Sequence, residues 1–164
     1  MPKKINNDLV RLLLKNELTI ALAESVTCGL AAHQLSTVIG TSIVLKGSIV
    51  CYHESFKTGL FSIPARVIKK HTAESQHVTD LLAKKLSRLV EADIHAAITG
   101  LAAPGGSETK TKPVGTIFIT VLYNRKVHTL RKKLTGTPTE IRKKACNNLY
   151  QFILDVLHAD DKRR

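Results

Sequence analysis

The sequence has few aromatic residues, few cysteines and no long apolar run. It contains three Tyr, four Phe and no Trp in 164 residues, so we expect an aliphatic core. Its three cysteines, Cys28, Cys51 and Cys146, are widely spaced and form no CxxC pair, which excludes a disulfide framework and a cysteine-based zinc motif. The seven histidines also lack ligand spacing, so we predict no metal and no cofactor.

No apolar segment reaches the roughly 20 residues that a membrane-spanning helix needs. The chain begins with Met1-Pro2-Lys3-Lys4 and continues with polar residues, without the apolar core of a signal peptide. We therefore expect a cytoplasmic protein that does not bind a membrane.

Acidic residues are scarce, because 13 Asp and Glu stand against 25 Lys and Arg, a formal net charge of +12. Such an excess attracts anions, including phosphorylated metabolites and nucleic acids. Many basic residues lie late in the chain, at Arg125, Lys126, Arg131, Lys132, Lys133, Arg142, Lys143 and Lys144. They are not interleaved with aromatic residues and match no nucleic-acid-binding motif, which argues against nucleic acid as a partner.

Segments with helical spacing of apolar residues alternate with strand-like segments. The spacing predicts helices over residues 5–16, 27–38, 56–61, 64–70 and 74–91. Apolar or alternating runs predict strands over residues 18–24, 48–52, 94–99, 115–123 and 126–134. A last helix begins after Thr137, which forms a capping box with Glu140.

This order of elements predicts a three-layer α/β/α sandwich with a mixed, mostly parallel sheet. The antiparallel part is a hairpin that turns at Asn124-Arg125. We expect a single domain over residues 1–164, in which residues 159–164 form a charged tail.

Two polar corners follow apolar strands. The first is Glu24-Ser25-Val26-Thr27-Cys28-Gly29, and the second runs from Thr99 to Gly106. Such corners present hydroxyls and backbone N–H groups at the end of a strand. Two of them in one small domain predict a site for a polar, anionic small molecule.

Together the motifs resemble the C-terminal domain of the competence/damage-inducible CinA family, from about Leu18 to Leu157. The family pattern Ala-Glu-Ser-Cys-Thr-Gly-Gly is similar to Ala23–Gly29, and its Lys-Pro-Val-Gly-Thr is intact at Lys112–Thr116. The other family motifs, Gly-Ser-Ser, Tyr-Ser-Asn-x-x-Lys, Ala-Val-Ser and Thr-Gly-x-Ala-Gly-Pro-x-Gly, resemble Gly40–Ser42, Tyr52–Lys57, Ala73–Ser75 and Thr99–Gly106.

The resemblance implies a nicotinamide mononucleotide deamidase, an amidohydrolase that converts this pyridine nucleotide to nicotinate mononucleotide and ammonia. It implies Ser25 as the nucleophile and Lys57 as the base. The substrate-binding residues that it implies are Thr27, Gly29, Tyr52, Thr99, Gly100, Gly105 and Arg142. Backbone N–H groups near Thr27 and Gly29 would serve as donors to an oxyanion or a phosphate. A homo-oligomer, a dimer or larger, is expected as well.

The residues alone leave simpler roles open. Ser25 and Thr27 also suit helix capping, and Lys57 also suits a solvated position. Thr99 alone would be a strand-end residue, and Tyr52 a core aromatic residue whose hydroxyl has a partner.

Three of the chain's departures from the family pattern bear on the predicted site. Cys28 and Ala103 stand where the family has Gly, and Pro138 replaces an arginine that is expected to bind substrate. Arg142, one helical turn later, matches a second family arginine. These departures keep open a second hypothesis, a catalytically silent paralogue that binds a nucleotide or a related anion.

Overall fold

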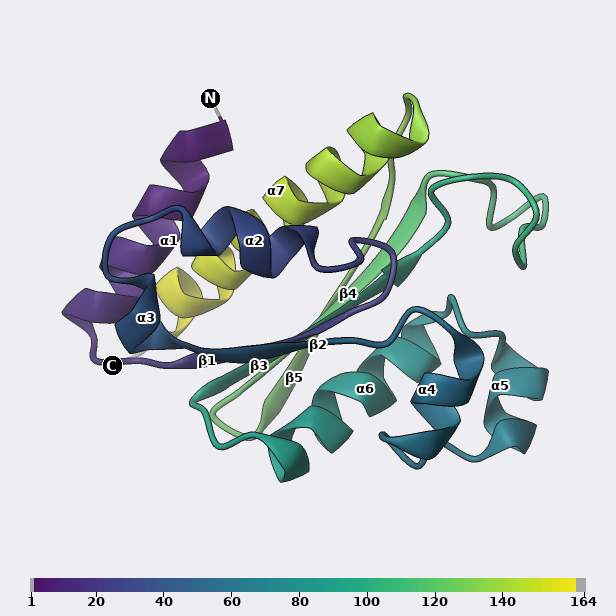
Figure 1. Cartoon of the computed structure of the whole chain (residues 1–164), viewed down its shortest axis with the longest axis horizontal. Helices are drawn as coiled ribbons and strands as arrows, with labels where there is room; N and C mark the ends of the chain where they lie inside the picture. Colours follow the sequence, from purple (N-terminus) through teal and green to yellow (C-terminus); the bar gives the residue numbers. More distant parts are fainter. Residues whose placement is uncertain (1, 162–164) are drawn as a thin grey trace.

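The computed structural model describes residues 2–161 and arranges them around a five-stranded sheet (Figure 1). The strands are β1 (Ile20–Glu24), β2 (Leu45–Val50), β3 (Ile94–Gly100), β4 (Thr116–Tyr123) and β5 (Lys126–Lys133). The helices are α1 (Pro2–Lys15), α2 (Leu30–Ser36), α3 (Thr41–Val44), α4 (Glu54–Gly59), α5 (Ala65–His71), α6 (Gln76–Leu89) and α7 (Pro138–Asp161).

The sheet is mixed, with strand order β2-β1-β3-β4-β5. Strand β1 pairs in parallel with β2 and with β3, whereas β4 is antiparallel to both β3 and β5. The strand β4 therefore runs against the other four, and the three parallel neighbours form the part of the sheet that carries the polar corners. This arrangement agrees with the predicted α/β sandwich with a mixed, mostly parallel sheet.

Helices cover both faces of the sheet (Figure 1). On one face, Ile20 and Leu22 of β1 and Ile119 of β4 pack in one apolar cluster with α1, α2 and α7. On the other face, the small residues Ala21, Ala23 and Ala97 join a second cluster with helices of the segment 54–89. Because successive strand residues point to opposite faces, one apolar strand supplies both layers. The small residues let the second helical layer approach the sheet closely.

The long helix α7 begins with the predicted capping box. The backbone N–H of Thr137 donates to the Glu140 carboxylate at 2.7 Å, and the Glu140 N–H donates to the Thr137 hydroxyl at 3.3 Å. Farther along α7, the hydroxyl of the buried Tyr150 donates to the Ala31 carbonyl at 2.7 Å. The helix is therefore held at its start by local bonds and in its middle by α2.

Several element boundaries differ from the prediction. Helix α2 is shorter than 27–38, because Cys28 and Gly29 have left-handed φ values of 50° and 89°. Between the predicted helix 27–38 and the predicted strand 48–52 lies the short helix α3, and β2 begins at Leu45, three residues early. Residues 159–161 belong to α7 and are no tail, which corrects that prediction, and residues 162–164 lie outside the described residues.

The capping box predicts a measurable stability effect. Replacing Thr137 by Ala removes the hydroxyl that accepts the Glu140 N–H, so the free energy of unfolding should fall by about 1 kcal/mol. Urea denaturation measures the loss. The matched control Thr135→Ala, at an exposed position just before the box, should change it by less than about 0.5 kcal/mol. Equal effects of the two substitutions would contradict the capping role.

Candidate active site

The candidate site lies at the carboxyl ends of β1 and β3. These adjacent strands are parallel, and β2, the strand that follows β1 in the chain, pairs with the opposite side of β1 from β3. The carboxyl ends of β1 and β3 therefore form a topological switch point. The backbone N–H of Ser25 donates to the Ile98 carbonyl at 3.0 Å, so the corner after β1 is fixed to β3. Both polar corners predicted from the sequence therefore meet at one edge of the sheet.

The side chains of Ser25 and Lys57 meet at this edge, although 32 positions separate them. Lys57 Nζ lies 3.1 Å from Ser25 Oγ, within hydrogen-bond distance. Nζ also donates to the backbone carbonyls of Cys51 at 2.7 Å and of Tyr52 at 3.2 Å. Lys57 is fully buried, so it is no solvated lysine. Its amine has a fixed place beside the Ser25 hydroxyl.

Burial lowers the pKa of the Lys57 amine, because the ammonium form loses its hydration. The nearby Cys51, Glu74 and Glu54 oppose this shift by favouring the charged form. The same burial raises the pKa of the Cys51 thiol to about 11. The pocket around Nζ therefore disfavours ionisation, and it favours an amine that can accept a proton.

The carboxylate of Glu24, the residue before Ser25, is completely buried and holds the first corner together. One of its oxygens accepts from the Thr27 hydroxyl at 2.8 Å and from the N–H groups of Gly29 and Ala31 at 3.0 Å each. The other accepts from the Ala32 N–H at 2.9 Å and the Ser48 hydroxyl at 2.8 Å. Glu24 thus caps α2, whose own N-cap residue, a glycine, has no side chain to do so.

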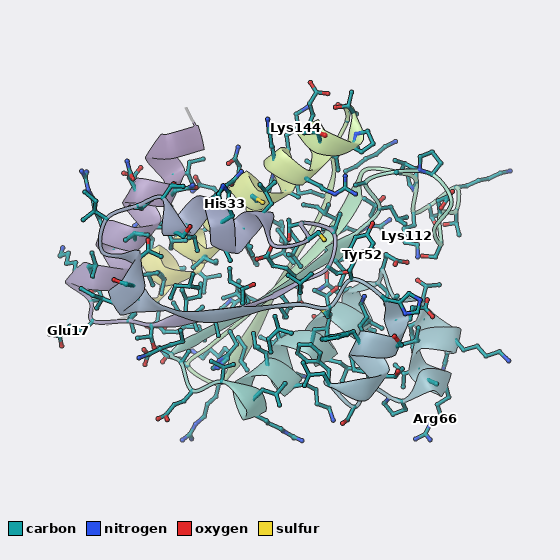
Figure 2. The ribbon with its side chains drawn as sticks, in the orientation of Figure 1. Glu17, His33, Tyr52, Arg66, Lys112 and Lys144 are labelled. Carbon is teal, nitrogen blue, oxygen red and sulfur yellow. The ribbon has the colours of Figure 1, made fainter. Side chains whose placement is uncertain are left out.

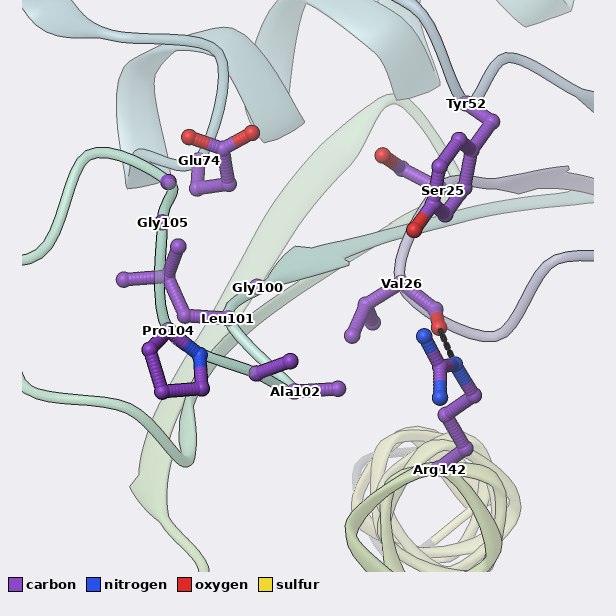
Figure 3. A pocket seen from close by; sticks show the side chains of 12 residues that line it. Ser25, Val26, Tyr52, Glu74, Gly100, Leu101, Ala102, Pro104, Gly105 and Arg142 are labelled. Carbon is purple, nitrogen blue, oxygen red and sulfur yellow. Dashed lines mark hydrogen bonds between the residues drawn. The ribbon is translucent and has the colours of Figure 1, made fainter. Parts of the chain in front are cut away.

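A cavity of about 220 Å³ opens beside Ser25. Twelve residues line it: Ser25, Val26, Tyr52, Glu74, the segment Gly100–Gly106 and Arg142 (Figure 3). Arg142 of α7 donates from Nε to the Val26 carbonyl at 3.1 Å, and its terminal nitrogens bond to no other described residue. The side chain of Tyr52, labelled in Figure 2, is exposed.

Glu74, at the junction of α5 and α6, stands on the wall opposite Ser25, Tyr52 and Arg142 (Figure 3). The Ser107 hydroxyl donates to its carboxylate at 2.5 Å. Lys112 Nζ in turn donates to the Ser107 hydroxyl at 2.7 Å and to the Glu74 backbone carbonyl at 3.0 Å. These bonds fasten the loop after β3 to the α5–α6 junction and fix that wall of the cavity.

The residues expected from the family resemblance divide into two groups. The first group lines the cavity and consists of Ser25, Tyr52, Gly100, Gly105 and Arg142. Lys57 does not line the cavity, but its amine contacts the Ser25 hydroxyl.

Thr27, Gly29 and Thr99 do not line the cavity, and their assignment as substrate-binding residues stays a prediction. Thr27 and Gly29 bind Glu24, and the buried Thr99 shares a hydrogen bond of 2.8 Å with Thr79. The Cys28 N–H is also occupied, by the Ser25 carbonyl at 3.1 Å. By contrast, the N–H groups of Val26 and Thr27 in the first corner donate to no described residue.

Two residues of the site were not predicted, Glu24 and Glu74. A carboxylate that ends an otherwise apolar strand indicates a buried acid with several donors, so Glu24 could have been found from the sequence. Glu74 could not, because its neighbours Ser107 and Lys112 come from a distant loop.

Of the departures from the family pattern, Cys28 is exposed and does not line the cavity. Ala103 lines the cavity without a positive φ, so this position does not require glycine. Pro138 is the first residue of α7, one turn before Arg142, so an arginine there would lie on the same side of the helix.

Fold and site define an α/β domain with a buried Ser–Lys pair at the ends of parallel strands. The sequence model of the CinA C-terminal domain matches residues 2–157. The chain belongs to this family.

Relatives with known names support the assignment. The chain is 35% identical over 156 residues to a CinA-like protein of Petrotoga mobilis, covering 94% of this chain and 38% of that protein. It is 39% identical over 148 residues to a CinA-like protein of Cytophaga hutchinsonii, covering 90% of this chain and 34% of that protein. The chain thus spans little more than a third of the length of these relatives.

A crystal structure of the competence damage-inducible protein A (ComA) from Klebsiella pneumoniae matches the fold with a TM-score of 0.90. The match covers 96% of this chain and 97% of that one at 22% identity, so it bears on the fold alone. Between Pro2 and Asp161, no helix has the length and apolarity that crossing a membrane requires.

The Glu24 carboxylate predicts the largest stability effect in the site. In Glu24→Gln, an amide NH₂ replaces one carboxylate oxygen and faces the N–H and O–H groups that donate to that oxygen. The free energy of unfolding should therefore fall by about 2–4 kcal/mol. Chemical denaturation measures this loss. The exposed Glu91→Gln is the matched control and should stay within about 0.5 kcal/mol of the parent. A Glu24→Gln protein as stable as the control would show that the carboxylate does not organise the corner.

Proposed function

We propose that this domain is an amidohydrolase that deamidates nicotinamide mononucleotide, with Ser25 as the nucleophile and Lys57 as the base. The observation that carries the proposal is the 3.1 Å contact between Lys57 Nζ and Ser25 Oγ at the edge of the cavity. The choice of substrate comes from the family resemblance. The presence of Arg142 in the cavity agrees with a substrate that carries an anionic group.

The bonds of Lys57 suit a neutral amine. A neutral Nζ has two hydrogens and one lone pair, and the two backbone carbonyls of Cys51 and Tyr52 can take both hydrogens. The lone pair is then left for the hydroxyl proton of Ser25. In this state the Ser25 O–H donates to Nζ, which is the arrangement that an activated serine needs.

The proposed reaction has two halves. Ser25 Oγ attacks the carboxamide carbon while Nζ takes the hydroxyl proton, and the carbonyl oxygen becomes an oxyanion. Nζ then returns the proton to the leaving nitrogen, so that ammonia departs and an ester to Ser25 remains. Water, deprotonated by Nζ, cleaves this ester to nicotinate mononucleotide and regenerates the serine.

The oxyanion requires donors near Ser25. The N–H groups of Val26 and Thr27 directly follow the nucleophile and bond to no described residue. We assign them to the oxyanion, in place of the occupied N–H groups of Cys28 and Gly29. Arg142 holds the Val26 carbonyl, so it fixes the peptide unit that carries the Thr27 N–H.

The Ser–Lys assignment predicts a loss of turnover on substitution of either residue. Ser25→Ala and Lys57→Met should each lower ammonia release from nicotinamide mononucleotide by at least about a thousandfold. A coupled ammonia assay measures it. The exposed Ser42→Ala and Lys84→Met are the matched controls and should retain the activity of the parent.

The same assay separates the proposal from its alternative. A folded parent protein that binds the nucleotide in calorimetry but releases no ammonia would be the silent paralogue, and the hydrolase proposal would be rejected.

The lowered pKa of Lys57 also predicts the pH dependence. Because the base must be neutral, kcat/KM should rise with pH through the folded-state pKa of Lys57 and then level off. Since burial lowers this pKa, the midpoint of the rise should lie below pH 10.5, the ordinary pKa of lysine. Initial rates across the pH range measure the profile, and a profile that falls as pH rises through this range would contradict a lysine base.

A further inference from the structure

The cavity has opposite charges on opposite walls. Arg142 lies beside Val26 on one side, and the Glu74 carboxylate lies on the other, across the opening from Ser25 (Figure 3). Glu74 and Arg142 are the charged residues among the twelve that line the cavity. In a chain with a formal charge of +12, a carboxylate at this place is a local exception.

The Glu74 carboxylate is fixed but forms no ion pair with a described residue. It accepts a hydrogen bond from the Ser107 hydroxyl at 2.5 Å. The Lys112 ammonium group donates instead to Ser107 Oγ, to the Thr72 hydroxyl and to the Glu74 backbone carbonyl. Lys112 and Lys57 interact with the carboxylate through space, without a hydrogen bond to it. The carboxylate is half-buried, so water screens it less than a surface charge. It therefore holds negative potential at a fixed point of the cavity wall.

We propose that Glu74 is a specificity-determining residue whose carboxylate selects a ligand with a positively charged aromatic ring over the same ligand with a neutral ring. This inference rests on the proposed function, because it concerns the ring whose carboxamide Ser25 attacks. Nicotinamide mononucleotide has a pyridinium ring with a permanent positive charge. Its reduced dihydropyridine form has nearly the same shape and no ring charge.

The positions of the groups agree with this selection. A ring whose carboxamide reaches Ser25 enters the space between Ser25 and the opposite wall, where Glu74 stands (Figure 3). The anionic end of the same molecule then has Arg142 as its partner, since the terminal nitrogens of Arg142 bond to no other described residue. A zwitterion with a cationic ring and an anionic group matches both walls.

The test measures binding without turnover. In the Ser25→Ala protein, calorimetry at pH 8 compares nicotinamide mononucleotide with its reduced form. We expect the oxidised form to bind roughly three- to tenfold more tightly, the range for a half-screened charge pair. Glu74→Gln in the same protein should abolish this preference. Glu74→Val is the second variant, should the glutamine protein fail to fold.

The matched control is Glu54→Gln. Glu54 is an exposed acid near Lys57 that does not line the cavity, so its removal should leave the preference unchanged. A preference that survives in both Glu74 variants overturns the inference. An equal weakening of both ligand forms also overturns it, because the carboxylate would then contact a group that the two share, such as a ribose hydroxyl. Absence of binding by either form overturns it as well.

The outcomes separate this inference from the proposed function. If the Ser25→Ala protein shows ring-charge selection by Glu74 but the parent protein releases no ammonia, only the proposed hydrolase activity is rejected. Ammonia release by the parent protein, with no ring-charge selection in the Ser25→Ala protein, would reject the role of Glu74 alone.

Discussion

The site depends on one buried carboxylate. Glu24 is fully enclosed, and its two oxygens accept five hydrogen bonds from α2, from the corner before it and from β2. A buried carboxylate without donors would be very costly, so these five donors must converge whenever the chain folds. Their convergence fixes the backbone that follows β1, and Ser25 is the next residue. The proposed nucleophile is thus positioned by the hydrogen bonds that the neighbouring Glu24 carboxylate requires.

Burial affects Lys57 differently, because its surroundings disfavour the charged form of the side chain. Its amine is buried with carbonyl and hydroxyl oxygens as hydrogen-bond partners, and burial disfavours its positive charge. Folding therefore places the amine where its charged form is less stable than in water. Burial of the amine therefore both lowers the stability of the fold and leaves the amine able to accept a proton. Such a position is retained only where the surrounding structure determines it, and here the carbonyls of Cys51 and Tyr52 do so.

The sequence predicts the layers and the pairing of Ser25 with Lys57 better than it predicts the remaining contacts. The period of two along a strand indicates which residues of β3 and β4 share a face, because that pattern is local. The family resemblance implies that Thr27, Gly29 and Thr99 bind substrate, and hydroxyls and N–H groups at a strand end suit a ligand. Their partners, Glu24 and Thr79, satisfy them within the protein. A motif alone does not tell whether its donors face a ligand or a neighbouring side chain.

Two departures from the family pattern change the charge of the cavity in the same direction. Pro138 stands in place of an arginine, one turn before Arg142, and Glu74 stands where the family motif has Val. The first removes a positive charge near the anionic end of the proposed substrate, and the second adds a negative charge to the opposite wall. Both weaken attraction to a phosphate and strengthen attraction to a cationic ring. Under the proposed function, recognition in this domain therefore rests more on the ring, and Arg142, which holds the Val26 carbonyl, is the proposed partner of the anion.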